Sequence, residues 1–340
     1  MSIYREGGEH EKERLARLEQ FRQTPVYFAS GSEKKAEVLR RSGMFKEIIL
    51  CASPDAGDRE PEDHRYFLET YDDHFFALFK TEAPMAVAKG KLDNMIGAGQ
   101  ARDDAFLLAA DTMPQFFPDT DEQGKDLKTS MEAISMERPK TKEEAKRQMK
   151  YVFMSIIRDY IAFRDFLHFQ AKDMAEREQP KDKIKRTLDL MWCGRLSSCV
   201  KVNTGIAMRF PQSKDIVTFN EEINIYPHVF YNMVDRELKE QYGDPDEDHD
   251  VQTEKLLKKV EAQVEQKIDE LIALLGEKVL QVSGGIDYSD PNVRACLGAR
   301  VSRNAQFIPE DQIDPEWFQG VPTKAIEEYI RRVAQGRQAS

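Results

Sequence analysis

The sequence lacks the patterns that identify several large classes of protein. Its four cysteines, Cys51, Cys193, Cys199 and Cys296, form no C-x-x-C pair and have none of the spacings of a disulfide framework. No apolar stretch approaches the ~20 residues that a membrane-spanning helix needs. The first fourteen residues, MSIYREGGEHEKER, lack the apolar run of a signal peptide. We therefore expect a cytoplasmic protein with free thiols and no membrane span.

Familiar catalytic motifs are also missing. The six histidines are scattered and never have the H-E-x-x-H spacing, so we predict no zinc site. Walker A, G-x-G-x-x-G and G-x-S-x-G motifs are absent too. P-loop ATPase, standard dinucleotide-binding and serine hydrolase functions therefore lack their characteristic residues.

The chain has fewer basic residues than acidic ones. Lysine and arginine number 50 against 61 aspartates and glutamates, which gives a formal net charge of −11. A surface of that sign repels phosphate backbones, so we expect no nucleic-acid partner. The chain is nonetheless 40% hydrophobic, with 19 phenylalanines along its 340 residues, and this is enough to form a folded core.

Alternating strand and helix patterns predict an α/β fold. The run VYFA is typical of a buried strand, and the helix predicted for EKKAEVLRR has Ser32 as its N-cap. FKEIILCA predicts a second strand, and AFLLAADTM predicts a short buried strand that ends at Asp111 and Thr112. The segments SSCVKVNTGIAMRF and DIVTFNEEINIY, with a turn at Pro211-Gln212-Ser213 between them, predict a hairpin.

Helical patterns account for most of the remaining chain. We expect residues 61–99 to be mostly helical with a break at Pro84, and residues 251–276 to form a helix that packs on the body or on a partner subunit. The acidic stretch at 244–250 is predicted to be a solvated loop. The expected organisation is an N-terminal helical extension over 1–22 and one domain over 23–340 with helical insertions near 145–196 and 232–278.

A polar loop is the first candidate site. Ser30, Ser32, Lys34 and Lys35 lie between a strand and a helix, where backbone N–H groups, hydroxyls and ammonium groups can converge on a phosphate. The alternative is that Ser32 only caps the helix while both lysines point to water.

The second candidate is the end of the AFLLAADTM strand. Asp111 could hold Mg²⁺ or position a water there, with Thr112 as a further polar ligand; the alternative is a residue that caps a turn. Lys91 and Arg138 are candidates to stabilise charge that develops on phosphate oxygens. Taken alone, each of these two cations is more typical of an ordinary surface than of a phosphate site.

In chain order these pieces resemble the Maf family of nucleoside triphosphate pyrophosphatases, whose members carry S-x-S-P-R-R, K-A, D-T and G-K-P elements. The segments that carry the resemblance are YFASGSEKKAEVL, SPDAGD, VAKGKL, LLAADTM, ERPKTKEEAKRQM, VNTGIAM and FQGVPTKAIEEYI. The resemblance implies a mixed, twisted sheet flanked by helices in a two-lobed Maf/ITPase-like fold. It leaves the N-terminal helix and both helical insertions unmatched.

The resemblance also implies roles for single residues. It implies that Ser30, Ser32, Lys34, Lys35 and Thr112 bind the triphosphate, that Asp111 and Asp58 hold Mg²⁺ or Mn²⁺, and that Asp111, Lys91 and Arg138 act in catalysis. Lysines stand here where the family's first motif has arginines, and Arg138 replaces the lysine of G-K-P.

The implied reaction is hydrolysis of a nucleoside triphosphate to the monophosphate and pyrophosphate, by a homodimer. Two alternatives stay open. One is a catalytically inactive nucleotide-binding or protein-interaction module with the same fold, and the other is a phosphoesterase that uses Asp111 on different esters.

Overall fold

The structure is a computed structural model, and it describes only part of the chain. The described residues are Glu19 and residues 23–51, 65–66, 76–79, 83–117, 133–136, 138–177, 179–193, 198–241, 249–304 and 306–334. Most of the predicted N-terminal helix, Asp58 with its SPDAGD segment, and residues 244–248 of the acidic loop lie outside the described residues.

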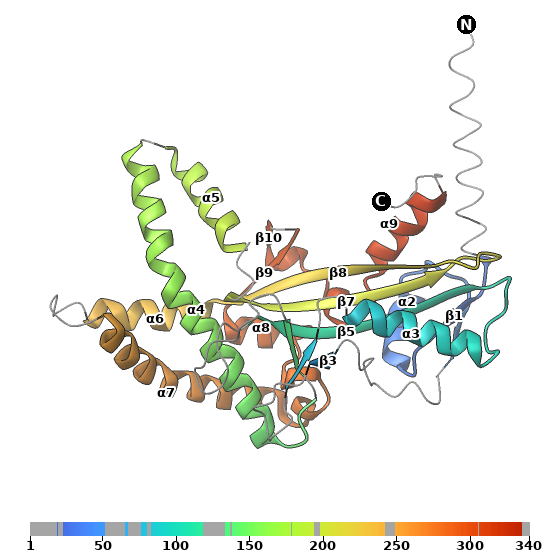
Figure 1. The fold of residues 1–340 in the computed structure, drawn as a ribbon, viewed down its shortest axis with the longest axis horizontal. Coiled ribbons are helices and arrows are strands. Elements are labelled where there is room, and N and C mark those ends of the chain that lie inside the picture. Colours follow the sequence, from blue (N-terminus) through green and yellow to red (C-terminus); the bar gives the residue numbers. More distant parts are fainter. Residues whose placement is uncertain are drawn as a thin grey trace, which may run out of the picture.

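The described residues form a mixed β-sheet flanked by helices, which confirms the predicted α/β class (Figure 1). The strand order is β10-β9-β8-β7-β5-β6-β4-β3, and β1 lies beside β5 and β2. β1 is parallel to both neighbours, whereas the other strand pairs are antiparallel. The strands are β1 (Val26–Phe28), β2 (Ile48–Leu50), β3 (Arg65–Tyr66), β4 (Phe76–Phe79), β5 (Phe106–Phe116), β6 (Ala133–Met136), β7 (Val200–Arg209), β8 (Ile216–Pro227), β9 (Ala299–Arg303) and β10 (Gln306–Ile308).

Helices gather at both ends of the long strands β5, β7 and β8 (Figure 1). The α-helices are α2 (Glu33–Arg41), α3 (Ala83–Gly97), α4 (Lys142–Glu176), α5 (Lys181–Cys193), α6 (His228–Gln241), α7 (His249–Leu275), α8 (Pro291–Leu297) and α9 (Thr323–Ala334). Short 3₁₀ turns lie at Gly276–Leu280, Ser283–Gly285, Glu310–Gln312 and Pro315–Phe318.

One edge of β5 changes partner halfway along. β1 pairs with residues 106–108 of β5, and β6 pairs with Gln115 and Phe116. Between these two pairings, residues 109–114 have no strand partner on that edge within the described part of the chain. The opposite edge pairs with β7 without interruption from Leu107 to Gln115. The sheet therefore has a gap directly beside Asp111 and Thr112.

Side chains of β5 alternate between two different packing layers, as a pleated strand requires. Phe106, Leu108 and Ala110 pack with α2 and α9 on one face. Leu107 and Ala109 pack with α3 on the other face. We call these the α2/α9 face and the α3 face, and the alternation places Asp111 and Thr112 on opposite ones.

Helices α4, α6, α7 and α8 pack on the α2/α9 face, beyond the pair Thr112–Thr204. Their cluster contains Val200, Val202 and Ile225 of the sheet together with buried residues of α4, α6 and α7. The buried stripe of α7 is Leu256, Val260, Val264, Ile268, Leu271 and Leu275, so the prediction that this helix packs on the body is confirmed.

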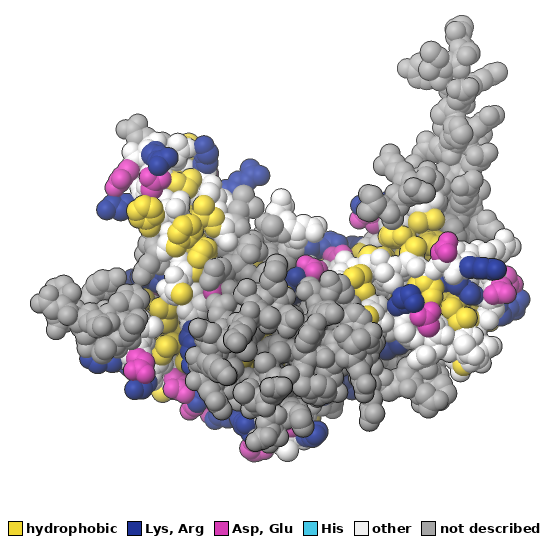
Figure 2. Space-filling view, viewed as in Figure 1, with side chains coloured by type: hydrophobic (Ala, Val, Ile, Leu, Met, Phe, Trp, Pro, Cys, Tyr) yellow, Lys and Arg dark blue, Asp and Glu magenta, His cyan; other side chains and the backbone are white. Residues whose placement is uncertain are grey.

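The far half of α4 and helix α5 project from the body as an arm (Figure 1). With 35 residues at 1.5 Å per residue, α4 is about 52 Å long. Figure 2 shows hydrophobic side chains along this arm, and Phe166 and Phe169 of α4 are 46% and 65% exposed.

Two local predictions are wrong. Residues 65–66 and 76–79 form strands rather than helix, and Pro84 lies in the first turn of α3 instead of breaking a helix. A proline is tolerated there because first-turn N–H groups have no partner within the helix. The strand containing Asp111 is also longer than predicted, because pairing with β7 carries it on to Phe116.

Two predicted absences can be examined only within the described residues. Cys51, Cys199 and Cys296 are free cysteines there. None of the helices that the structure describes has the length and apolar character needed to cross a bilayer.

Candidate functional site

The centre of the site is an ion pair between Asp111 of β5 and Lys91 of α3. Lys91 Nζ lies 2.5 Å from Asp111 Oδ1, and each side chain is 15% exposed. The pair forms because α3 packs its apolar side on Leu107 and Ala109, which brings Lys91 over the next residue of β5 on that face. These two residues, chosen from the sequence, are brought together by the fold.

The start of α3 packs closely on Gly205 of β7, the residue paired with Asp111. A Cβ atom at Gly205 would lie 2.1 Å from the backbone carbon of Pro84, so only glycine fits under the start of this helix. No acidic residue lies in the first turn of α3. The N-terminal end of a helix carries partial positive charge, and here it lies one strand away from Asp111.

Thr112 forms a second group on the α2/α9 face. Its Oγ1 lies 3.0 Å from Oγ1 of Thr204, its partner on β7. Lys35 of α2 donates to the carbonyl oxygen of Ala110 at 3.4 Å, across the gap in the sheet. A Cβ atom at Gly320 would lie 2.5 Å from Thr112 Oγ1 and 3.0 Å from Lys35 Nζ, so the FQGVP segment closes over this group.

The loop between β1 and α2 lies at the same gap. Ser32 is the N-cap of α2, as predicted, and its Oγ accepts from the backbone N–H of Lys35 at 3.3 Å. Ser30 Oγ accepts from the N–H of Ser32 at 3.1 Å. The structural role considered for Ser32 is therefore confirmed, and both hydroxyls remain beside the open edge of β5.

Three predicted site residues are not joined to this centre. Lys34 is exposed, because it lies one position before Lys35 and so faces about 100° away on the helix. Arg138 is exposed, and in the described regions no hydrogen bond or ion pair links it to Asp111 or Lys91. Asp58 lies outside the described residues.

The polar residues of the α2/α9 face continue across the sheet from Thr204. Glu221 of β8 is the partner of Thr204, and it forms an ion pair with Arg303 of β9. The Arg303 guanidinium lies 5.2 Å from the centre of the Trp317 ring. Sequence reasoning missed these residues, because only the register of β7 with β8 brings them into line.

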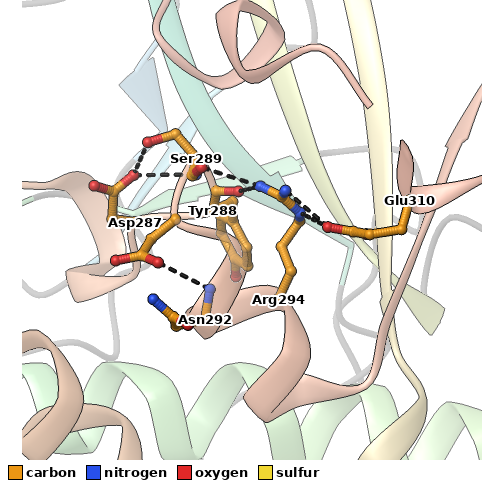
Figure 3. A network of polar contacts seen from close by, with 7 residues as sticks. Asp287, Tyr288, Ser289, Asn292, Arg294 and Glu310 are labelled. Carbon is orange, nitrogen blue, oxygen red and sulfur yellow. Dashed lines mark hydrogen bonds and ion pairs between the residues drawn. The ribbon is translucent and has the colours of Figure 1, made fainter. Parts of the chain in front are cut away.

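A separate polar network has a structural explanation (Figure 3). Arg294 of α8 donates to the carbonyl oxygens of Tyr288 at 2.8 Å and Ser289 at 3.1 Å, and it forms an ion pair with Glu310 at 2.8 Å. Asp287 accepts from the N–H of Ser289 at 3.1 Å. This network fixes the GGIDYSD turn against the segment after β10.

The metal-binding capacity of the site is limited to one carboxylate among the residues that can be placed. No group of three or more histidine, cysteine, aspartate or glutamate side chains that could hold a metal occurs in the described regions. Mg²⁺ commonly uses one or two protein carboxylates and completes its shell with water and substrate phosphates. Asp111 fits that pattern.

Comparison with known proteins adds no assignment. No family model matches this sequence, and no curated protein matches it.

Proposed function

We propose that this chain is a Maf-like nucleoside triphosphate pyrophosphatase that hydrolyses a nucleoside triphosphate to the monophosphate and pyrophosphate. The observation that supports it is the Asp111–Lys91 pair beside the gap in β5, with the capped β1–α2 loop at the same gap.

Each residue of the centre has a role in this reaction. Asp111 accepts the proton of the attacking water, and Lys91 stabilises negative charge on the phosphate oxygens. Lys35 and the hydroxyls of Ser30, Ser32 and Thr112 bind the remaining phosphates at the gap. Bound Mg²⁺ or Mn²⁺, with Asp111 as its protein ligand, would neutralise charge on the leaving pyrophosphate.

The direct test is pyrophosphate release from a panel of nucleoside triphosphates with Mg²⁺. Asp111→Asn keeps the shape but removes the charge, and we expect it to lower kcat by about 100-fold or more, the usual contribution of a general base. Lys91→Met should also lower turnover, because it removes the cation that faces the phosphates.

A matched control lies on the same helix. Lys89 and Asp93 form an exposed ion pair at 2.8 Å, so Lys89→Met and Asp93→Asn alter similar charges away from the sheet. Both variants should keep native turnover. Equal losses in the control and site variants would contradict the assignment.

Two other outcomes would replace the proposal. Folded native protein that binds nucleotides without releasing phosphate would be the inactive nucleotide-binding module. Release of orthophosphate instead of pyrophosphate would indicate a phosphoesterase that acts on other esters.

A further inference from the structure

Along the arm, one side of α4 carries exposed and partly exposed residues at intervals of three and four positions. We call them the arm stripe: Arg158, Ala162, Phe166, Phe169, Asp173 and Glu176. At about 100° per residue, their directions around the helix differ by at most about 80°. The six residues therefore share one face of α4.

A different side of the same part of α4 is covered. Phe163 and Leu167 pack against the apolar core of the body, and Met174 is partly buried. The Phe163 ring also stacks on the Phe166 ring, with centroids 5.3 Å apart, and this contact orients the exposed ring. The arm stripe is thus a fixed surface that the described part of the chain leaves open.

Such exposure is rare in this protein. Among the described residues, three large hydrophobic side chains are exposed, Phe166, Phe169 and Leu274, and the first two are neighbours on the arm stripe. With ~200 Å² of surface for a phenylalanine, the exposed fractions of 46% and 65% leave about 220 Å² of the two residues in water. A partner that covers both rings removes this area from water, which favours association.

The arm stripe has two defined ends. Ser155, which precedes Arg158 on the same face, is buried, and α4 ends at Glu176. The open length from Arg158 to Glu176 is about 27 Å, and its midpoint lies between Phe166 and Phe169. A second copy of α4 that runs antiparallel therefore fits this length from end to end. In that arrangement Phe166 of each copy lies opposite Phe169 of the other.

The charges of the stripe favour the same arrangement. Arg158 lies at one end and has no ion pair among the described residues, whereas Asp173 and Glu176 lie at the other end. Within the chain, Glu176 lies 3.9 Å from the exposed Lys172, at the limit of an ion pair. Antiparallel packing places Arg158 of each copy beside Glu176 of the second copy, and parallel packing would place like charges together.

We propose that the arm stripe is a homodimer interface, in which α4 of two copies pack antiparallel about a two-fold axis between Phe166 and Phe169. The same patch is then used by both copies, as a two-fold interface requires. A contact about 27 Å long and one helix wide, ~10 Å, is small beside the ~800 Å² per partner of a standard interface. We therefore expect a reversible dimer with a dissociation constant in the micromolar range.

The test is sedimentation equilibrium of the full chain over micromolar to submillimolar concentrations. Phe169→Glu should raise the dissociation constant at least 10-fold, because it places a charge against an apolar ring. Leu274→Glu is the matched control: it changes an exposed hydrophobic residue of α7, and the dissociation constant should stay native. Both side chains are exposed, so circular dichroism and the melting temperature of the monomer should be unchanged.

A charge exchange tests the antiparallel direction. Arg158→Glu and Glu176→Arg should each raise the dissociation constant several-fold, because each places like charges together at both ends of the contact. The double variant restores opposite charges between the copies, and it should regain native affinity. Within one copy the two residues are about 27 Å apart along α4, so this rescue cannot arise inside a single chain.

Four results would overturn the proposal. They are a native chain that is monomeric at every concentration, a dimer that tolerates Phe169→Glu, an equal loss in Leu274→Glu, and a double variant that stays as weak as its single variants. A monomeric native chain that cosediments with phosphatidylcholine–phosphatidylserine vesicles, and loses this in Phe169→Glu, would assign the arm stripe to a lipid surface instead.

Discussion

Single residues show how closely the sheet and α3 are fitted. Gly205 has the backbone of Pro84 where a side chain would begin, whereas a Cβ atom at Gly90, on α3 itself, would meet no described atom within 4 Å. Only Gly205 is therefore required to be a glycine by its surroundings.

We predict opposite effects for alanine at these two positions. Gly205→Ala should lower the free energy of unfolding by about 1–3 kcal/mol, the usual cost of overpacking, and should reduce turnover by displacing Lys91 from Asp111. Gly90→Ala should raise the free energy of unfolding by about 0.5–1 kcal/mol, because alanine favours the helix. Urea denaturation of both variants checks this, and a Gly205→Ala protein as stable as the native chain would show that α3 does not contact β7 so closely.

The cap of α2 at Ser32 was predictable because it depends only on neighbouring residues. Asp111 and Lys91 stood out as charges beside apolar segments, and the fold pairs them, while their role in catalysis stays a prediction. Thr204 and Gly320 were not found, because strand register and a distant loop bring them into place. The side chains of Asp111 and Thr112 point to opposite faces of the sheet because β5 continues beyond both residues instead of ending at them.

At the scale of elements, the junction between β8 and α6 contains a partly buried histidine, His228. Burial, and to a smaller extent the positive charge of Arg300, lower the pKa of His228 to about 4, and Asp189 opposes the shift. Its Nε2 atom is buried without a hydrogen-bond partner in the described part of the chain, and its ring packs edge-on against Tyr231 with centroids 5.0 Å apart. The folded protein therefore favours the neutral imidazole.

This shift predicts a specific pH dependence of stability. Between pH 4 and the ordinary histidine pKa of ~6.5, the unfolded chain binds a proton at His228 that the folded chain does not bind. Stability should therefore fall as the pH drops through this window, by up to about 1.4 kcal/mol per pH unit from this residue. His228→Phe keeps the ring but cannot titrate, so its unfolding free energy should fall less steeply between pH 6 and 4.5. Parallel pH profiles for the two proteins would contradict the prediction.

The element order was predictable in most of the described chain. The strands around β1, β2, β7 and β8 and the helices α2, α4, α5 and α7 are where periodicity placed them. The error at residues 61–99 came from segments whose strands pair only with β6 and with each other, a contact that local periodicity does not record.

At the scale of the whole molecule, β7 takes part in every hydrophobic cluster of the described residues. Val200 and Val202 belong to the cluster of the long helices, Ile206 and Met208 to that of α2 and α9, and Ala207 to that of α3. The three clusters are therefore joined through one continuous strand.

We therefore predict one cooperative unfolding transition. The signals from tryptophan fluorescence and far-ultraviolet circular dichroism should change at the same urea concentration. Each cluster contains residues of β7, so unfolding of one cluster disrupts the strand on which the other two depend. Two separated transitions would show that the helical insertions fold independently. Homodimer formation stays a prediction, which light scattering on the purified protein decides.

The central pairing of the sheet also has a consequence for how the chain reaches this structure. Thr112 and Thr204 are 92 residues apart in sequence, and α4 and α5 occupy most of that interval. Bringing such distant segments together is entropically expensive, and proteins dominated by distant contacts fold slowly. Helices form within microseconds, so α4 and α5 can shorten the interval before β5 meets β7. The insertions would then accelerate folding, and proline substitutions inside α4 should slow refolding more than they speed unfolding.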